Sequence, residues 1–317
     1  MVKVAIAGIG ELAQELIKVL LEGGRHEITA LSRKASQRRL DSPSDIPPGL
    51  SWSKVDYNDK PQFARALRGF DAVLSFILVF SDESYRAQLN LIDAAIEAGV
   101  KRFAPSEWSV FVLDHYPMYS YKIQTRQYLE RLNRNGKVLE YSLFTPGIFM
   151  NYLGPKEKLK EKNLSYSGLF IDFEKCRAIL PEDTDAVVSF VSVDDSIAVV
   201  SEALECDSDW PVIGGIAGSR LTISDLVRLG EAVRGKRFTV EVARRHDLQL
   251  GKLGTSWIPG SHHSGTSSQQ ELTMEQMTAY TLLAIPDGHW NLSDEWNKLL
   301  PEHEFLDIET FLRQAWS

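Results

Sequence analysis

A short apolar segment, followed by a glycine turn and a helical pattern, constrains this 317-residue chain more than any other feature. Residues 4–7 read Val-Ala-Ile-Ala, the kind of apolar run that a buried parallel strand needs. Gly8 and Gly10 interrupt the run, and apolar residues then recur at helical spacing from Leu12 to Leu20. This order exposes backbone N–H groups at a helix N-terminus, where a pyrophosphate can bind.

The turn has the pattern Gly-x-Gly-x-x-Ala, with Ala13 at the third small position, where close packing of helix on strand is the requirement. Turns of this kind also occur without a ligand. The end of the next predicted strand, residues 27–31, adds a second indication, because Ser32, Arg33 and Lys34 follow it. An NAD site usually carries a carboxylate here, whereas an NADP site accommodates a cation. The sequence therefore predicts NADPH/NADP as cofactor, with its 2′-phosphate on Arg33 and Lys34; the alternative is a solvated basic strand end.

The composition limits the partners and the compartment. The net charge of −8 argues against a nucleic-acid surface, and two cysteines, Cys176 and Cys206, indicate a reducing compartment without a disulfide framework. No apolar run reaches the roughly 18 residues of a membrane span, and the short N-terminal apolar stretch is not typical of a signal peptide. We therefore expect a cytoplasmic protein with a small-molecule substrate and no nucleic-acid or membrane partner. The sheet edges and the tryptophan-rich tail could support a homodimer, although nothing specifies one.

Strands and helices alternate through the first half of the chain. Further strands are predicted at residues 51–55, 71–77, 100–106 and 139–144, and helices at residues 60–67, 85–98 and 118–135. This alternation predicts an α/β fold with a doubly wound parallel sheet of the Rossmann type. Ligands bind such sheets at the carboxyl ends of the strands. The residues that should converge on one crevice are those after Ala7, Leu31, Ser75, Pro105 and Phe144.

The second half is less regular and predicts a smaller, discontinuous α+β domain that closes over the crevice. Its predicted strands are 187–192, 212–214 and 238–242, and its predicted helices are 193–204, 222–235 and 272–284, with a solvated helix at 156–162. We predict a Rossmann domain at residues 1–150, with a returning segment at about 187–218, and a mainly substrate-binding domain at residues 151–317. Loop 256–270 would form a lid, and residues 292–316 predict a packing surface.

Lys122 lies near the start of the predicted helix 118–135. The positive end of the helix dipole disfavours a cation there, which helps to lower the pKa of the amine. A lysine with a lowered pKa can act as an acid or a base near neutral pH. Arg126 and Glu130 follow at intervals of four residues, so the alternative is a surface ladder of Lys, Arg and Glu without a catalytic role.

The other candidate residues are less specific. His262 and His263 are adjacent and have no Cys or carboxylate at ligand spacing, so no metal site is predicted. His115 and Tyr116 precede the predicted helix and could reach a substrate, although a loop histidine with a structural partner is the simpler interpretation. The residues that would line a pocket for a planar substrate, each also compatible with a core position, are Trp108, Phe149, Met150, Tyr152 and Trp257.

Several of these segments match one known family. They are the Gly8/Gly10/Ala13 turn, Ser32 to Lys34, residues 101–108 (Lys-Arg-Phe-Ala-Pro-Ser-Glu-Trp), Lys122 with Arg126 and Glu130, and residues 145–150 (Thr-Pro-Gly-Ile-Phe-Met). On these the chain resembles the NmrA-like family of atypical short-chain dehydrogenases, in its isoflavone-reductase-like branch, and the tail 296–316 resembles fungal members. The resemblance implies NADPH as cofactor and Lys122 as the catalytic or hydride-assisting residue. It also implies that residues 145–150 pass under the nicotinamide.

The sequence departs from the family pattern in two places. Many relatives have Thr-Gly-x-x-Gly in the first turn, whereas here Glu11 follows Gly10 and brings a carboxylate near the phosphates unless it points outward. The Tyr-x-x-x-Lys dyad of ordinary short-chain dehydrogenases is absent, because Met118 lies four residues before Lys122. Chemistry must then depend on Lys122, a bound water or the reactivity of the substrate.

Together, the patterns and the resemblance predict an NADPH-dependent reductase that transfers hydride to a small, aromatic or polycyclic intermediate of secondary metabolism. The reduced group would be a C=C, C=O, C=N or benzylic ether, with Lys122 as acid/base or electrostatic stabiliser. The expected cofactor contacts are Gly8, Gly10, Glu11, Leu12, Arg33, Lys34, Ser75, Phe76, Ile77, Pro105, Ser106, Lys122, Pro146, Gly147 and Phe149. The alternative is a non-catalytic NADP(H)-sensing regulatory protein, and a third interpretation is a Rossmann-like domain that has lost its cofactor.

Overall fold

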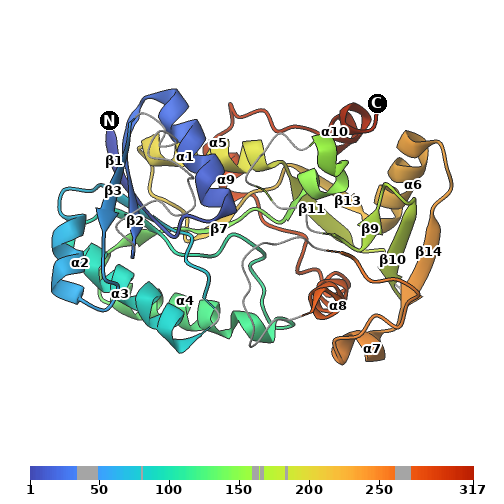
Figure 1. Ribbon diagram of the computed structural model, residues 1–317, viewed down its shortest axis with the longest axis horizontal. Helices are drawn as coiled ribbons and strands as arrows, with labels where there is room; N and C mark the ends of the chain where they lie inside the picture. The colour runs from blue at the N-terminus through green and yellow to red at the C-terminus, as the bar shows by residue number, and fades with distance from the viewer. Residues whose placement is uncertain (34–48, 80, 159–163, 165–167, 183–184, 261–272) are drawn as a thin grey trace.

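A six-stranded parallel sheet forms the centre of the N-terminal half (Figure 1). The structure is a computed structural model that describes residues 1–33, 49–79, 81–158, 164, 168–182, 185–260 and 273–317. The strands are β1 (Val2–Ala7), β2 (His26–Ser32), β3 (Leu50–Lys54), β4 (Ala72–Ser75), β5 (Arg102–Ala104) and β6 (Glu140–Tyr141). Their order is β3-β2-β1-β4-β5-β6, with every pairing parallel. The order reverses between β1 and β4, as in a doubly wound Rossmann sheet, which confirms the predicted fold class.

Helices cover both faces of this sheet. One face carries α2 (Lys60–Leu67), α3 (Asp82–Ala98) and α4 (Ser120–Asn133), and the other carries α1 (Glu11–Gly23) and α5 (Val193–Glu205) (Figure 1). Each layer buries its own apolar cluster against the sheet. Helix α5 comes from the second half of the chain but contacts α1. The second half of the chain therefore contributes directly to the layer that faces the glycine turn.

The predicted strand 139–144 divides at Ser142. Its first part, β6, pairs with β5, whereas β7 (Leu143–Thr145) pairs in parallel with β12 (Ile213–Gly215). The Ser142 hydroxyl lies at the break and accepts a hydrogen bond from the indole N–H of Trp296, at 3.2 Å. Both side chains are buried. A strand and a tryptophan from the second half therefore complete the edge of the sheet.

Two small sheets and four helices make up most of the remainder. One sheet has the order β13-β11-β8 and the other β14-β10-β9. The strands are β8 (Ile148–Phe149), β9 (Ile171–Asp172), β10 (Arg177–Pro181), β11 (Val187–Val191), β13 (Ser219–Thr222) and β14 (Thr239–Ala243). The helices are α6 (Ile223–Arg234), α7 (Arg245–Gln249), α8 (Met274–Ala284) and α10 (Ile308–Ala315), and α9 (Glu295–Leu299) lies near β12. Among the described residues, none of the helices is long and apolar enough to cross a membrane. The predicted domain boundaries stay a prediction.

Other elements also differ in extent from the sequence-based predictions. Strand β5 ends at Ala104 because Pro105 has no N–H to donate, and the Glu107 N–H turns back to the Pro105 carbonyl at 2.8 Å. Helix α4 begins at Ser120, after a 3₁₀ turn at Pro117–Tyr119. The predicted helix 156–162 is a 3₁₀ turn at Lys156–Lys158 where the structure describes it. Four predicted features lie outside the described residues: Lys34, His262, His263 and residues 261–270 of the lid.

Candidate functional site

Gly8 follows β1 directly and is required by the fold. Its φ angle is +86°, in the left-handed region that favours glycine. A Cβ atom at this position would meet the backbone of Phe76 and Ile77 at 2.7–2.8 Å. The ends of β1 and β4 therefore approach each other at a point where only glycine fits. The packing of the two strands is therefore enough to explain a glycine at position 8, with or without a bound ligand.

Gly10 differs from Gly8, because no contact with the described residues requires a glycine there. It is the N-cap of α1, with φ −88° and no capping side chain, and a Cβ atom built on it meets no atom within 4 Å. The helix that it opens has Glu11 in its first turn. Open space in front of an uncapped helix N-terminus fits a bound pyrophosphate. The Glu11 carboxylate also lies close enough to Tyr152 to add to the rise that burial causes in the pKa of that phenol.

Arg33 follows β2 at the carboxyl edge of the sheet, where the predicted 2′-phosphate site lies. Its guanidinium is 3.5 Å from the Glu83 carboxylate at the start of α3. Both side chains are about seven-tenths exposed, and an ion pair of this kind contributes little free energy. Arg33 can therefore exchange this partner for a phosphate at little cost.

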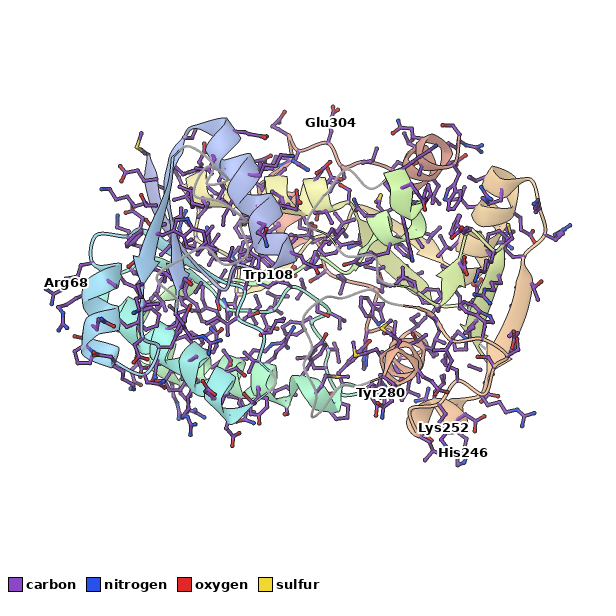
Figure 2. All side chains as sticks on the ribbon, viewed as in Figure 1. Arg68, Trp108, His246, Lys252, Tyr280 and Glu304 are labelled. Carbon is purple, nitrogen blue, oxygen red and sulfur yellow. The ribbon has the colours of Figure 1, made fainter. Side chains whose placement is uncertain are left out.

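The ends of β4 and β5 meet through an aromatic stack. The Trp108 ring lies parallel to the Phe76 ring with centroids 4.3 Å apart, and its indole N–H donates to the Ser75 carbonyl at 2.7 Å. Trp108 has a φ of +35°, which is strained for a bulky residue. The stack continues through Phe144 to Trp296. Figure 2 places Trp108 near the middle of the molecule, close to the start of α1.

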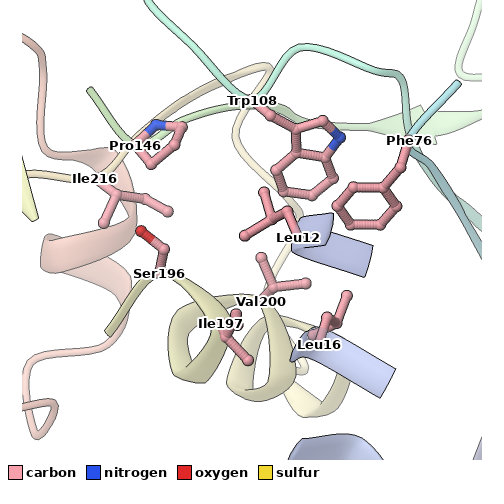
Figure 3. Close-up of a pocket in the computed structure, with 9 residues that line it drawn as sticks. All are labelled: Leu12, Leu16, Phe76, Trp108, Pro146, Ser196, Ile197, Val200 and Ile216. Atoms are coloured by element: carbon pink, nitrogen blue, oxygen red, sulfur yellow. The ribbon is translucent and has the colours of Figure 1, made fainter. Parts of the chain in front are cut away.

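A small apolar pocket lies beneath this stack (Figure 3). Its lining residues are Leu12, Leu16, Phe76, Trp108, Pro146, Ser196, Ile197, Val200 and Ile216. The structure therefore brings together four residues that the sequence singled out: Leu12, Phe76, Trp108 and Pro146. It adds the wall supplied by α5 and the segment after β12. The sequence predicted that a segment at about 187–218 returns to the Rossmann domain, but no pattern indicated that its helix would line this pocket.

Lys122 follows Trp108 in the chain, on α4, and two contacts hold its amine. Its amine donates to the backbone carbonyl of Glu107 and lies 4.2 Å from the centre of the Tyr119 ring. The Glu107 carboxylate in turn receives two hydrogen bonds from Arg126, of 3.1 and 2.6 Å. A further Arg126 N–H donates to the Phe111 carbonyl at 2.6 Å. These contacts tie the first turns of α4 to the loop that follows β5.

The surroundings of Lys122 lower the pKa of its amine to about 8. Burial is the largest cause, Arg126 lowers the pKa further, and Glu107 opposes both. The predicted fall in pKa is thus present, although burial rather than the helix dipole is its main source. The surface-ladder alternative is wrong for Arg126, because its side chain is only 12% exposed and pairs with Glu107, whose side chain is 1% exposed.

The other predicted cofactor contacts described by the structure lie after strand ends or in a tight turn. Pro105 and Ser106 follow β5 and precede Glu107, and Ile77 lies after β4, where its N–H donates to the Ser75 hydroxyl at 3.4 Å. Gly147 has φ +75°, and a Cβ there would meet the Ser189 carbonyl at 2.8 Å, so packing on β11 explains this glycine.

The four predicted substrate residues other than Trp108 are not all near the pocket. The rings of Phe149 and Tyr152 pack edge to face, 6.1 Å apart, whereas Met150 is completely buried. Trp257 lies over Arg177 of β10, 4.0 Å from its guanidinium. Figure 1 draws β10 at the opposite end of the molecule from β1. Roles for these residues stay predictions.

The parallel sheet, its strand order and the glycine turn after β1 define a protein of the Rossmann type. The chain belongs to the NmrA-like family, whose model matches residues 3–312. This match confirms the family that the sequence motifs indicated.

Two fungal relatives are named oxidoreductases. The chain is 24% identical to oxidoreductase swnN of Metarhizium robertsii over an alignment of 342 positions, which covers 100% of this chain and 98% of that protein. It is 30% identical to oxidoreductase aprR of Aspergillus flavus over 166 positions, or 48% of this chain and 52% of that protein.

Solved structures share the fold along the whole chain. The NADPH-dependent quinone oxidoreductase QOR2 of Escherichia coli, complexed with NADPH, superposes with a TM-score of 0.69 at 17% identity, covering 99% of this chain and 100% of that one. AtPrR2 with NADP+ and (+)-pinoresinol superposes with a TM-score of 0.70 at 16% identity, covering 99% of this chain and 98% of that one. At these identities the likeness shows the fold.

Proposed function

We propose that this protein is an NADPH-dependent oxidoreductase that reduces a small aromatic or polycyclic substrate. The observation that carries the proposal is the Lys122 amine, held beside the carboxyl end of β5 with a pKa of about 8. An amine with this pKa still holds its proton at neutral pH and can release it to an anion that develops nearby. The fungal relatives and the NADPH-bound structural neighbours support this class of reaction.

The residues present fit the cofactor. The α1 N-terminus and the open space at Gly10 would hold the pyrophosphate, and Arg33 would bind the 2′-phosphate. Trp108, Phe76 and Pro146 bring apolar surfaces to the strand ends, beside which a nicotinamide would lie. NADPH, when bound, supplies the hydride.

Within this site the chain itself provides the proton and excludes water. The Lys122 Nζ–H donates to the oxygen or nitrogen that gains negative charge as the substrate accepts hydride, and the amine is left neutral. The Glu107 carbonyl and the Tyr119 ring fix the direction of that N–H bond. The aromatic stack keeps water away from the reacting face. A cofactor sensor would have no use for a half-buried lysine with a lowered pKa at this place, so we favour the enzyme over the regulatory alternative.

Replacing Arg33 by Ala should raise the Kd for NADPH about 10- to 100-fold and leave that for NADH almost unchanged. The physical reason is the loss of charge-assisted hydrogen bonds to the 2′-phosphate, which NADH lacks. Energy transfer from tryptophan to the reduced nicotinamide measures both constants. The matched control is Arg237→Ala, whose side chain is 93% exposed in the turn after α6. Equal losses for the two cofactors, or none, would exclude Arg33 as the phosphate ligand.

Gly10→Ala should weaken NADPH binding at least roughly tenfold while costing no more than about 1 kcal/mol in the free energy of unfolding. Its new methyl group would fill space that is open within the chain and that the pyrophosphate needs. Gly8→Ala is the contrasting variant and should lower stability by about 2 kcal/mol or more, because strain and a backbone clash coincide there. Urea unfolding and cofactor titration separate the two effects. Unchanged binding in folded Gly10→Ala would place the pyrophosphate elsewhere.

A further inference from the structure

A second cluster of chemically active side chains shares no residue with the aromatic stack or with the contacts of Lys122. His115, from the loop before α4, and Asp287 and His289, from the turn after α8, converge there. One ligand atom from each lies within 4.8 Å of the others. The His115 Nε2 and Asp287 Oδ2 atoms are already 2.6 Å apart. We propose that these three residues bind one divalent transition-metal ion such as Zn²⁺.

The spacing suits such an ion. With bonds of about 2.1 Å, neighbouring ligand atoms of a tetrahedral or octahedral site are roughly 3.0–3.4 Å apart. The His115 and His289 ring centres are 5.0 Å apart, so small side-chain rotations bring both nitrogens onto one ion. Two imidazoles and one carboxylate are a donor set that zinc accepts, and Asp287 is exposed enough to leave a coordination position for water.

The backbone holds both histidines in place. Tyr116 and Trp290, the residues that follow them, are buried and joined by a hydrogen bond of 2.9 Å from the indole N–H to the phenol oxygen. Gly288, with φ +78°, forms the turn that separates Asp287 from His289. The cluster is thus anchored on the core and not on two independent loops.

One nitrogen of the cluster has no assigned role. The Nδ1 atom of His289 is buried and has no hydrogen-bond partner among the described residues, which is costly for a polar atom unless something binds it. A metal ion would coordinate either this Nδ1 atom or, after rotation of the ring, the Nε2 atom of His289. This observation is independent of the contact between His115 and Asp287.

Arg245 competes with a metal ion for Asp287 and so limits the expected metal affinity. Arg245, at the start of α7, donates two hydrogen bonds to Asp287, of 3.2 and 3.0 Å. Asp114 is the other charged group that acts on His289. Arg245 must share Asp287 with the ion or release it, so its removal should tighten metal binding. If the cluster were only an ion-pair network, removing Arg245 would weaken the cluster and would not tighten metal binding, because the network needs Arg245.

The test uses the full chain with His262→Ala and His263→Ala as background, so that those two imidazoles cannot contribute to the zinc that is counted. Competition with a chromogenic chelator should give one Zn²⁺ per chain in this background. His289→Asn should weaken the affinity at least about tenfold, and Arg245→Gln should strengthen it. The matched control is His246→Asn, an exposed histidine on α7 that Figure 2 labels at the periphery, which should change nothing.

Cobalt provides a second readout, because the visible absorption of bound Co²⁺ reports its coordination geometry. His289→Asn should remove this absorption while thermal unfolding without metal stays near that of the background. Loss of zinc binding in the background itself, or an unchanged affinity in folded His289→Asn, would overturn the proposal. In that case the cluster is an ion-pair network and the prediction of no metal site holds.

Discussion

Lys122→Met is expected to lower kcat roughly 100-fold or more while the Kd for NADPH changes little. Methionine keeps the length and the apolar stem but removes the proton donor, and general acid catalysis of this kind contributes about 10²–10⁴-fold. The contact with the Glu107 carbonyl is lost, yet no contact of the Gly8–Gly10 turn changes. Lys101→Met is the matched control, because its side chain is 77% exposed and pairs with Asp71 at the surface. Wild-type kcat in Lys122→Met would remove this residue from the mechanism.

The pH dependence of kcat in the wild-type enzyme should also report the protonation of Lys122. Because the protonated amine is the active form and its pKa is about 8, kcat should be level below pH 8 and fall above it. Lys122→Met should lack this alkaline limb. A rise in kcat through the same range would mean that the neutral amine is active, as a base and not as an acid.

Glu107→Gln is expected to have the second large effect, on both stability and the pH profile. The carboxylate is almost completely buried and pairs with Arg126, so its loss leaves a buried guanidinium without a counter-charge. Removing one member of such a pair costs about 3 kcal/mol or more in the free energy of unfolding, which urea denaturation measures. Because Glu107 raises the pKa of Lys122, the alkaline limb should also move to lower pH.

Arg126→Gln provides the opposite test of the same geometry. Arg126 lowers the pKa of Lys122, so its removal should move the alkaline limb to higher pH, although stability again falls. Two destabilised variants with limbs shifted in opposite directions cannot be explained by partial unfolding. Limbs that stay in place in both would show that Glu107 and Arg126 only support the fold.

The elements that short-range sequence signals determine could be predicted from the sequence. Helix α2 runs from Lys60 to Leu67 as predicted, because Asp59 caps it, Pro61 suits its first turn and Gly69 follows its end. The glycine turn and the alternation of strands and helices predicted the parallel sheet. The family resemblance singled out both Lys122 and residues 101–108, and the Lys122 amine donates to the Glu107 carbonyl.

The contacts that the sequence could not show join distant residues. Arg126 and Glu107 are 19 positions apart and form a pair because the loop after β5 folds back over α4. His115 and Asp287 are 172 positions apart. Helix α5, part of the segment predicted to return, lines the pocket itself, and Trp108 adopts a backbone conformation that a tryptophan rarely occupies. Tertiary packing decides all of these, and a pattern within one segment carries no information about it.

Hydride transfer itself is the most direct test of the central claim. In a single-turnover experiment, enzyme loaded with NADPH is mixed with a panel of aromatic acceptors that includes quinones and benzylic ethers, and the nicotinamide absorbance is followed. We predict that at least one acceptor oxidises NADPH, that the rate falls roughly 100-fold or more in Lys122→Met, and that Lys101→Met reacts like wild type. NADPH that binds tightly but is oxidised by no acceptor, or at equal rates in both variants, would contradict a reductase that depends on Lys122.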